Sequence, residues 1–287
     1  MSDVYQIENS SLILQINSKG AEMRRLFSKE WGRELLWPGD EKTWNRSAPV
    51  LFPIVGKLKD GHYDLHGKTY TMPQHGFARD YEFKCLRSNV SEIEFSLVAS
   101  QQSFTMYPFC FVLNAHYKVE GSRVNISYTV KNDDRQTIFF SIGAHPAFET
   151  SELENYEIKF QKDEKEFYLT TEGLVDWRSP CEFAATQMPI SKDTFKSDAL
   201  IFKNMNSRYV DLINKKTKEI IRISAVTPFF GIWGKGDVPF VCLEPWQGVS
   251  DEVTHDKNFT DKIGIISLEI GKTFEFSYSI EIMKRAK

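Results

Sequence analysis

Alternation of apolar and polar residues runs through the chain from its first segments to its last. It is clear in SLILQINS (11–18), EIEFSLVAS (92–100), RVNISYTVKN (123–132) and TFEFSYSIEI (273–282). A period of two puts alternate side chains on opposite faces of a strand, so each segment predicts a strand with one buried face. No stretch of a dozen residues keeps the apolar spacing of a core-facing helix. The pattern therefore predicts an all-β fold with few, short helices.

Turn signals between these segments predict how the strands pair. Glu120-Gly121, Lys215-Lys216 and Gly271 each separate two strand-like runs, as in β-hairpins. No Gly/Ser linker, Pro-rich hinge or fixed-period repeat marks a domain boundary. With 287 residues and 41% hydrophobic content, the chain can bury a sizeable core. We expect one domain, residues 1–287, folded as a large antiparallel β-sandwich.

The charge balance excludes several classes of partner. Thirty-six Lys and Arg against thirty-nine Asp and Glu leave a net charge of −3, which provides no strong single-sign field for a nucleic acid. No window approaches 18 uninterrupted apolar residues, and the first 25 residues lack the pattern of a secretory signal. We expect no membrane partner and a cytoplasmic location. The oligomeric state is not indicated by the sequence.

The cysteines point to neither disulfides nor a structural metal. Cys85, Cys110, Cys181 and Cys242 are scattered, without a C-x-x-C pair, so we expect four free thiols and no zinc site. No serine lies in a G-x-S-x-G elbow, and no cysteine is framed as a nucleophile. Covalent acyl chemistry therefore has no support.

Four segments depart from strand alternation, and we look for function in them: 44–61, 72–80, 139–148 and 231–251. Their charged or titratable side chains interrupt aromatic and apolar surroundings; they include Arg46, Lys57, His75, Arg79, His145 and Glu244. A carboxylate directly after a buried-looking strand, as at Glu244, is costly unless it is paired or functional. Taken singly, each residue also has an ordinary explanation as a turn histidine, a paired carboxylate or a surface arginine.

A histidine and a carboxylate facing each other across a small polar ligand can divide general acid and general base work. Interconversion of sugar anomers needs such a pair: a base takes the proton of the C1 hydroxyl, an acid protonates the ring oxygen, C1 rotates, and the steps reverse. No metal or cofactor is required. Trp44, Trp233 and Trp246 lie in or beside the four segments, and indole faces suit stacking on a sugar ring, although single tryptophans are more often core residues.

Several motifs occur together in a fixed order: NSKGAEMRRL, NRSAPVLFPIVGKLKDG, MPQHGFARD, GAHPAF, SDALIF and CLEPWQGVSD. In this combination the chain resembles the aldose 1-epimerase (galactose mutarotase-like) superfamily, and within it the LacX-type branch. The resemblance runs over nearly the whole chain. It implies a large antiparallel β-sandwich with the sugar site on one concave face, and an isomerase that exchanges anomers through the open-chain aldehyde.

The resemblance also implies roles for individual residues. His145 in GAHPAF corresponds to the general acid and Glu244 in LEPW to the general base. His75 in QHGFAR corresponds to a second histidine, which orients the sugar near the ring oxygen. Asp198 in SDALIF matches a substrate-binding aspartate. We also expect Trp246 to bind the substrate, because its indole face suits stacking on a sugar ring.

One departure from the family pattern leaves the substrate open. Galactose mutarotases proper carry an Asn-Arg pair in a G-R-x-x-N-R-I stretch, whereas residues 56–61 here read GKLKDG. Arg46 and Arg79 resemble arginines of sugar-phosphate-acting relatives, and together with Lys57 they could hold an anion. A hexose and a hexose phosphate are therefore both candidate substrates.

Two other classes of function stay open at this point. One is a non-catalytic carbohydrate-binding or sugar-sensing protein on the same fold, although binding alone requires neither an acid nor a base. The other is a hydrolase that uses Glu244 and Asp251 as paired carboxylates, as glycosidases do. The acid and base together favour the mutarotase.

Overall fold

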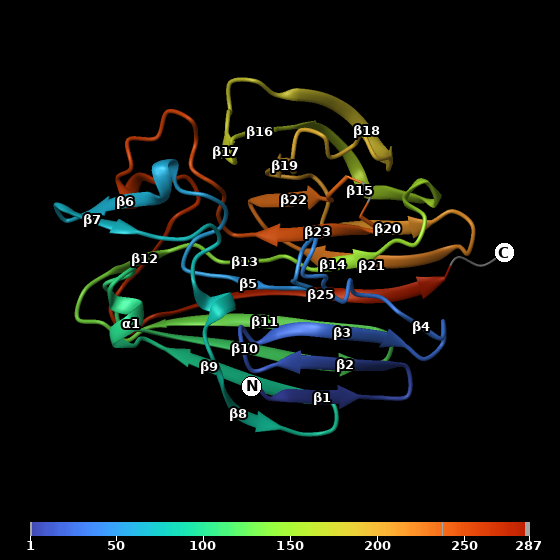
Figure 1. The fold of residues 1–287 in the computed structure, drawn as a ribbon, viewed down its shortest axis with the longest axis horizontal. Coiled ribbons are helices and arrows are strands. Elements are labelled where there is room, and N and C mark those ends of the chain that lie inside the picture. The colour runs from blue at the N-terminus through green and yellow to red at the C-terminus, as the bar shows by residue number, and fades with distance from the viewer. Residues whose placement is uncertain (1, 237, 285–287) are drawn as a thin grey trace.

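Antiparallel strands make up most of the computed structural model, which describes residues 2–236 and 238–284 (Figure 1). Within this part of the chain the helical segments are all short: α1 (Gln101–Phe104), η1 (Lys59–Gly61), η2 (Ala78–Asp80), η3 (Leu153–Asn155) and η4 (Phe259–Asp261). None of the described helices has the length and apolar character needed to cross a bilayer. The prediction of an all-β fold with few, short helices is confirmed.

The largest sheet has nine strands in the order β18-β15-β20-β21-β25-β11-β10-β9-β8. Their bounds are β8 (Lys84–Ser88), β9 (Glu92–Val98), β10 (Phe111–Glu120), β11 (Arg123–Asn132), β15 (Tyr156–Phe167), β18 (Cys181–Pro189), β20 (Tyr209–Asn214), β21 (Glu219–Ala225) and β25 (Thr273–Lys284). Alternate residues of β10 and β11 are buried, as the period-two pattern predicts. One face of this sheet therefore carries a large part of the core.

A four-stranded sheet covers one end of that face (Figure 1). It contains β1 (Val4–Glu8), β2 (Leu12–Asn17), β3 (Glu22–Ser28) and β4 (Arg33–Glu34). The Tyr5 ring of β1 lies 5.3 Å from the Phe95 ring of β9, and the Tyr117 hydroxyl of β10 donates to the carbonyl of Ala21 at 2.6 Å. These contacts join the two sheets into a sandwich.

A six-stranded sheet covers the rest of the core and carries the features described below. Its strands are β19 (Leu200–Lys203), β22 (Phe229–Trp233), β23 (Phe240–Trp246), β13 (Gly143–Ala144) and β5 (Val50–Leu51), with β14 (Ala147–Glu149) also paired to β23. The Phe202 ring of β19 lies 4.9 Å from the Phe160 ring of β15. The Phe52 ring, next to β5, lies 5.0 Å from the Phe111 ring of β10. Aromatic packing thus holds this sheet on the nine-stranded one.

Three strand pairs lie outside these sheets: β6 (His62–Leu65) with β7 (Lys68–Thr71), β12 (Ile138–Phe140) with β24 (Ile266–Leu268), and β16 (Thr170–Thr171) with β17 (Leu174–Val175). The hairpins predicted at Glu120-Gly121 and Lys215-Lys216 are confirmed as β10–β11 and β20–β21.

The hairpin predicted at Gly271 is wrong. β24 pairs with β12, and β25 pairs with β11 and β21. The turn itself exists, because the Lys272 N–H donates to the Glu269 carbonyl, but the Gly271 N–H donates to the carbonyl of Asn132 at the end of β11. After this contact the chain leaves the β12–β24 pair and enters the nine-stranded sheet. There β25 lies between β11 and β21 and buries alternate side chains.

Candidate functional site

The strand register brings a histidine and a glutamate face to face. Ala147 of β14 lies opposite Cys242 of β23, and continuing this antiparallel register by two residues places His145 opposite Glu244. The His145 Nε2 atom lies 3.2 Å from the Glu244 Oε2 atom. Glu244 is 1% exposed and His145 is 7% exposed. A titratable pair is therefore buried in the middle of the six-stranded sheet.

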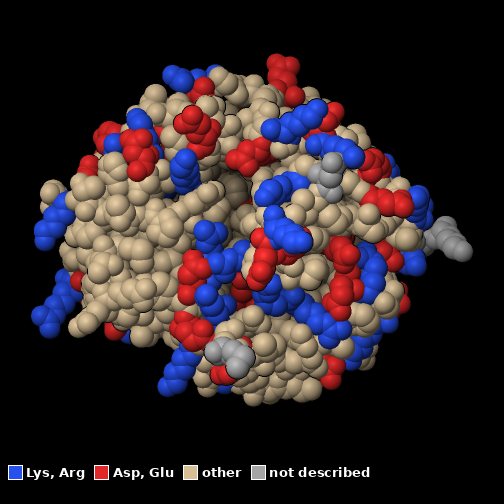
Figure 2. Space-filling view, viewed as in Figure 1, with Lys and Arg blue, Asp and Glu red and all other residues tan. Residues whose placement is uncertain are grey.

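A cavity of about 620 Å³ opens at this pair. Eight of the residues singled out from the sequence line it: Trp44, His75, Arg79, His145, Asp198, Trp233, Glu244 and Trp246. The space-filling view shows the surface hollowed near β22, with both basic and acidic side chains around the hollow (Figure 2). The sequence segments that break strand alternation thus converge on one cavity.

His75 is held in a defined orientation by the backbone around it. Its φ of 65° places it in the left-handed region, at a turn where Gly76 packs so tightly that a Cβ would lie 2.2 Å from the Phe52 carbonyl oxygen. The Gly56 N–H donates to His75 Nδ1 at 3.1 Å. The neutral ring therefore carries its proton on Nε2, where it can be donated.

Burial keeps this histidine uncharged. It lowers the pKa of His75 well below the ordinary value of 6.5, and the nearby His145 and Arg79 lower it further. The rings of His75 and His145 lie 5.4 Å apart, edge to face. A neutral hydrogen-bond donor thus stands beside the His145–Glu244 pair.

Burial also disfavours the charged forms of the pair itself. It raises the pKa of Glu244 well above 4.5, and the negative charge of Asp198 raises it further. Burial lowers the pKa of His145 to about 3, with Arg79 adding to the effect. Burial therefore favours the neutral forms of the two groups, a carboxylic acid at Glu244 and an imidazole at His145.

Aromatic rings form part of the cavity wall. The Trp44 ring lies 5.0 Å from the His145 ring and 5.5 Å from the Trp233 ring. Trp246 packs against Gly231, where a Cβ would lie 2.5 Å from the indole. Flat apolar faces therefore border the titratable pair.

Asp198 lies in the turn before β19 and has a φ of 75°. The Thr170 hydroxyl, from β16, donates to its Oδ2 atom at 2.8 Å. A strand and a turn thus hold one carboxylate at the cavity, where it can accept hydrogen bonds from hydroxyl groups.

Arg46 and Lys57 lie outside this cavity. The Arg46 guanidinium is paired with Glu22 at 3.3 Å and with Asp80, and it donates to the Arg79 carbonyl at 3.0 Å. The Lys57 ammonium donates to a backbone carbonyl at 2.9 Å. The predicted anion-binding set of three cations is therefore not assembled, and only Arg79 reaches the cavity.

The match to known proteins spans almost the whole chain. Residues 3–281 match the profile that describes aldose 1-epimerases. The chain belongs to the aldose 1-epimerase family. The chromosomal protein LacX of Lactococcus lactis subsp. lactis is 29% identical to it, over 97% of this chain and 99% of LacX. The LacX-like resemblance seen in the sequence is thus confirmed.

Solved structures of relatives share the fold of this family member. A galactose mutarotase related enzyme from Lactobacillus acidophilus superposes with a TM-score of 0.94, at 30% identity and 98% coverage of both chains. A galactose mutarotase-like protein from Lactobacillus casei superposes with a TM-score of 0.90, at 27% identity, over 98% of this chain and 100% of that one. The predicted galactose mutarotase-like β-sandwich is confirmed.

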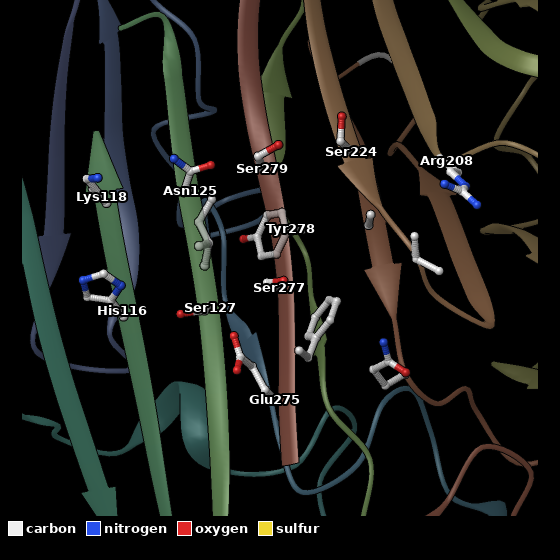
Figure 3. A pocket seen from close by; sticks show the side chains of 15 residues that line it. His116, Lys118, Asn125, Ser127, Arg208, Ser224, Glu275, Ser277, Tyr278 and Ser279 are labelled. Carbon is white, nitrogen blue, oxygen red and sulfur yellow. The ribbon is translucent and has the colours of Figure 1, made fainter. Parts of the chain in front are cut away.

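This aldose 1-epimerase family member has a second hollow, of about 670 Å³, on the outer face of the nine-stranded sheet (Figure 3). Ser127, Ser277, Ser279 and Ser224 lie along β11, β25 and β21 there. Its histidine, lysine, arginine and glutamate side chains are all at least partly exposed. Since it holds no buried acid–base pair among the described residues, it is a weaker candidate for proton chemistry.

Several lining residues of the cavity were not predicted. They are Gln74, Thr170, Phe195, Lys235 and Ser250. Gln74 directly precedes His75, so its position in the motif could have indicated it. Thr170 and Lys235 have no local sequence signal, because only the tertiary fold brings them to the cavity.

Proposed function

We propose that this protein is an aldose 1-epimerase (mutarotase), an isomerase that interconverts the α and β anomers of a hexose through the open-chain aldehyde. The observation that carries the proposal is the buried pair of His145 and Glu244, 3.2 Å apart at the wall of a cavity in a member of this family. Each group supplies one of the two proton transfers, which need neither a metal nor a cofactor.

Ring opening assigns one proton transfer to each partner. The reactive form is the one in which the proton of the pair lies on His145. Glu244, then a carboxylate, takes the proton of the C1 hydroxyl, and His145, then an imidazolium, gives its proton to the ring oxygen. The C1–O5 bond breaks as the C1 carbonyl forms. The pair then consists of a protonated glutamate and a neutral histidine, which is the state that burial favours through the pKa of each group. After rotation about C1–C2, the reverse transfers close the ring on the other face.

The remaining cavity residues have positioning roles in this proposal. His75 would donate its Nε2–H to the region of the sugar ring oxygen, because its Nδ1 already accepts the N–H of Gly56. The Asp198 carboxylate accepts from sugar hydroxyls, and the rings of Trp44 and Trp246 supply apolar contact. Together they would hold C1 and the ring oxygen between the acid and the base.

We infer that the substrate is an unphosphorylated hexose. Two of the three cations suggested by the sequence for an anion, Arg46 and Lys57, are engaged elsewhere. The third, Arg79, lines the cavity but donates to the Gln74 carbonyl at 2.7 Å. The ammonium of Lys235, which lines the cavity, donates to the Thr43 carbonyl at 2.7 Å. Asp198 adds a negative charge that repels a phosphate dianion.

Polarimetry of freshly dissolved α-galactose and α-glucose tests the activity. The rotation should relax faster in proportion to protein concentration, and glucose 6-phosphate should be a poor competitor. A kcat/KM for the phosphate ten times that for the free sugars would refute the neutral substrate. Sugar binding without accelerated relaxation would refute the enzyme and favour a carbohydrate-binding protein, for which the tryptophan-lined cavity is the supporting observation.

A further inference from the structure

A third ligand-type side chain lies beside the proton-transferring pair. Cys242 occupies the same face of β23 as Glu244, two residues earlier, and lies opposite Ala147, two residues after His145. A ring nitrogen of His145, the Cys242 sulfur and a carboxylate oxygen of Glu244 all lie within 4.8 Å of one another. Cys242 is 0% exposed, so the three groups form a buried cluster.

Two atoms of this cluster are buried without a hydrogen-bond partner in the described part of the chain. They are the Glu244 Oε2 atom and the His145 Nδ1 atom. Buried polar atoms are normally satisfied by protein, water or an ion. The cluster therefore has unused capacity to bind at the point where it opens into the cavity.

Thiolate, imidazole and carboxylate together are the ligand types of zinc. In a tetrahedral zinc site the metal–ligand bonds of about 2.0–2.3 Å place the ligand atoms roughly 3–4 Å apart. The ligand atoms of this cluster lie within 4.8 Å of one another, so small side-chain rotations would bring them to those distances. His145 and Glu244 line the cavity, so a fourth position would face it and take a water or a sugar hydroxyl.

We propose that His145, Cys242 and Glu244 form a binding site for Zn²⁺ that blocks the activity of this cavity. The proton of the Cys242 thiol and the proton of the Glu244 carboxyl both pass to solvent as the sulfur–zinc and oxygen–zinc bonds form, and the neutral His145 ring donates a nitrogen lone pair to the ion. Zinc is thus an inhibitor here and takes no part in turnover. The binding stands independently, whereas the inhibition rests on the proposed mutarotase function.

Titration with Co²⁺ tests the binding, because four-coordinate Co²⁺ bound to a thiolate has a near-ultraviolet charge-transfer band and strong visible bands. The wild-type protein should take up one equivalent with both features, and Zn²⁺ should displace it. Cys242→Ser should lose the near-ultraviolet band and bind Zn²⁺ at least tenfold more weakly. Cys110→Ser is the matched control, because Cys110 is also a free thiol but lies directly before β10, and it should behave as wild type.

Two further variants keep the test decisive if Cys242→Ser does not fold. Glu244→Gln and His145→Gln each remove one ligand and leave the sulfur, so both should weaken Co²⁺ binding and retain the near-ultraviolet band. No Co²⁺ uptake by the wild type, or identical spectra and affinities for Cys242→Ser and wild type, would overturn the site.

Anomer exchange measured with and without Zn²⁺ tests the inhibition, with each variant compared with its own metal-free rate. Wild type should lose its rate enhancement as the site fills and regain it with a chelator, and Cys110→Ser should respond alike. Zinc bound at Cys242 without loss of exchange would refute inhibition. Zinc binding in a protein that exchanges no sugar would refute the mutarotase and leave the metal site intact.

Discussion

At the scale of single residues, Glu244 and His145 are in surroundings that disfavour their charged forms. Burial raises the pKa of the carboxyl and lowers the pKa of the imidazole, so the order of the two pKa values is the reverse of that in water. Because the groups are in contact, they titrate as a pair. The pair holds one proton over a wide range of pH, and one proton is what the exchange of anomers requires.

The pH dependence of kcat/KM follows from this reversal. Below the pKa of His145 the pair takes up a second proton, and above the pKa of Glu244 it loses its only one. Since burial lowers the pKa of His145 to about 3, we expect the acid limb to lie far below the ordinary histidine value of 6.5. Polarimetric rates across the pH range would check this. An acid limb near pH 6.5 would contradict the assigned environment.

Asp198→Asn tests the electrostatic contribution of the neighbouring carboxylate. Asp198 raises the pKa of Glu244, so its neutralisation should lower that pKa and shift the alkaline limb of the kcat/KM profile to lower pH. Asparagine tolerates the φ of 75° and keeps an acceptor for Thr170, so the fold should persist.

Asp193→Asn is the matched control for this change. Asp193 is an exposed residue of the same loop, paired with Lys196 on the surface, so the profile of the control should not move. Equal profiles for Asp198→Asn and wild type would show that Asp198 does not act on Glu244.

At the scale of elements, glycines in two strands make room for Trp246, which lies two residues after Glu244 on β23. Gly143 of β13 and Gly231 of β22 flank Trp246, and a Cβ at either would lie 2.7 or 2.5 Å from the indole. Gly231 also lies opposite Glu244 in the ladder. The two strands therefore leave little free space around the indole at the cavity wall.

Gly231→Ala should displace this indole. Overpacking of a buried site costs about 1–3 kcal/mol, and the loss of stacking area should raise KM more than it lowers kcat. Urea unfolding and steady-state kinetics measure the two effects. Trp246→Phe in the same chain removes the ring atoms that clash, so it should restore part of the stability. Strictly additive losses in the double variant would exclude the clash as the cause.

At the scale of the whole molecule, a buried ion pair joins the loops beneath the cavity. The Lys262 ammonium lies 2.8 Å from the Asp251 carboxylate and donates to the Val249 carbonyl at 2.6 Å. Asp251 also accepts the N–H of Lys59 at 2.9 Å. Asp251 thereby connects the segment after β23 to the segment after β5. The latter contains Gly56, whose N–H donates to His75. Asp251 therefore makes structural contacts and is absent from the cavity lining. It is not placed there as the second carboxylate that a hydrolase would need beside Glu244.

Lys262→Met should leave Asp251 buried and unpaired. Removing one partner of a buried pair costs about 3–5 kcal/mol, which urea unfolding would measure as a lower midpoint. Lys257→Met is the matched control, because Lys257 pairs with the largely exposed Asp60 and its loss should change stability little. Equal losses in the two variants would contradict the importance of the buried pair.

The sequence predicts local features of the molecule better than its long-range pairings. Alternation over 123–132 locates β11 to the residue, because one buried face dictates the pattern. The sequence also indicates the turn at Gly271, but the pairing of the following strand, β25, is with β11 and β21, which are distant in sequence. Likewise, Arg46 lies in a functional motif, yet its guanidinium faces Glu22, and nothing near either residue in the sequence indicates that contact.

Saturation transfer between the α and β anomeric protons of galactose and glucose tests the central claim most directly. Transfer should rise in proportion to wild-type protein, and Glu244→Gln should lower the exchange rate by about 10²–10⁴-fold while the sugar signals stay broadened by binding. Glu275→Gln, at an exposed glutamate on the outer sheet face, should match wild type. Undiminished exchange in Glu244→Gln would contradict the assignment of Glu244 as the base.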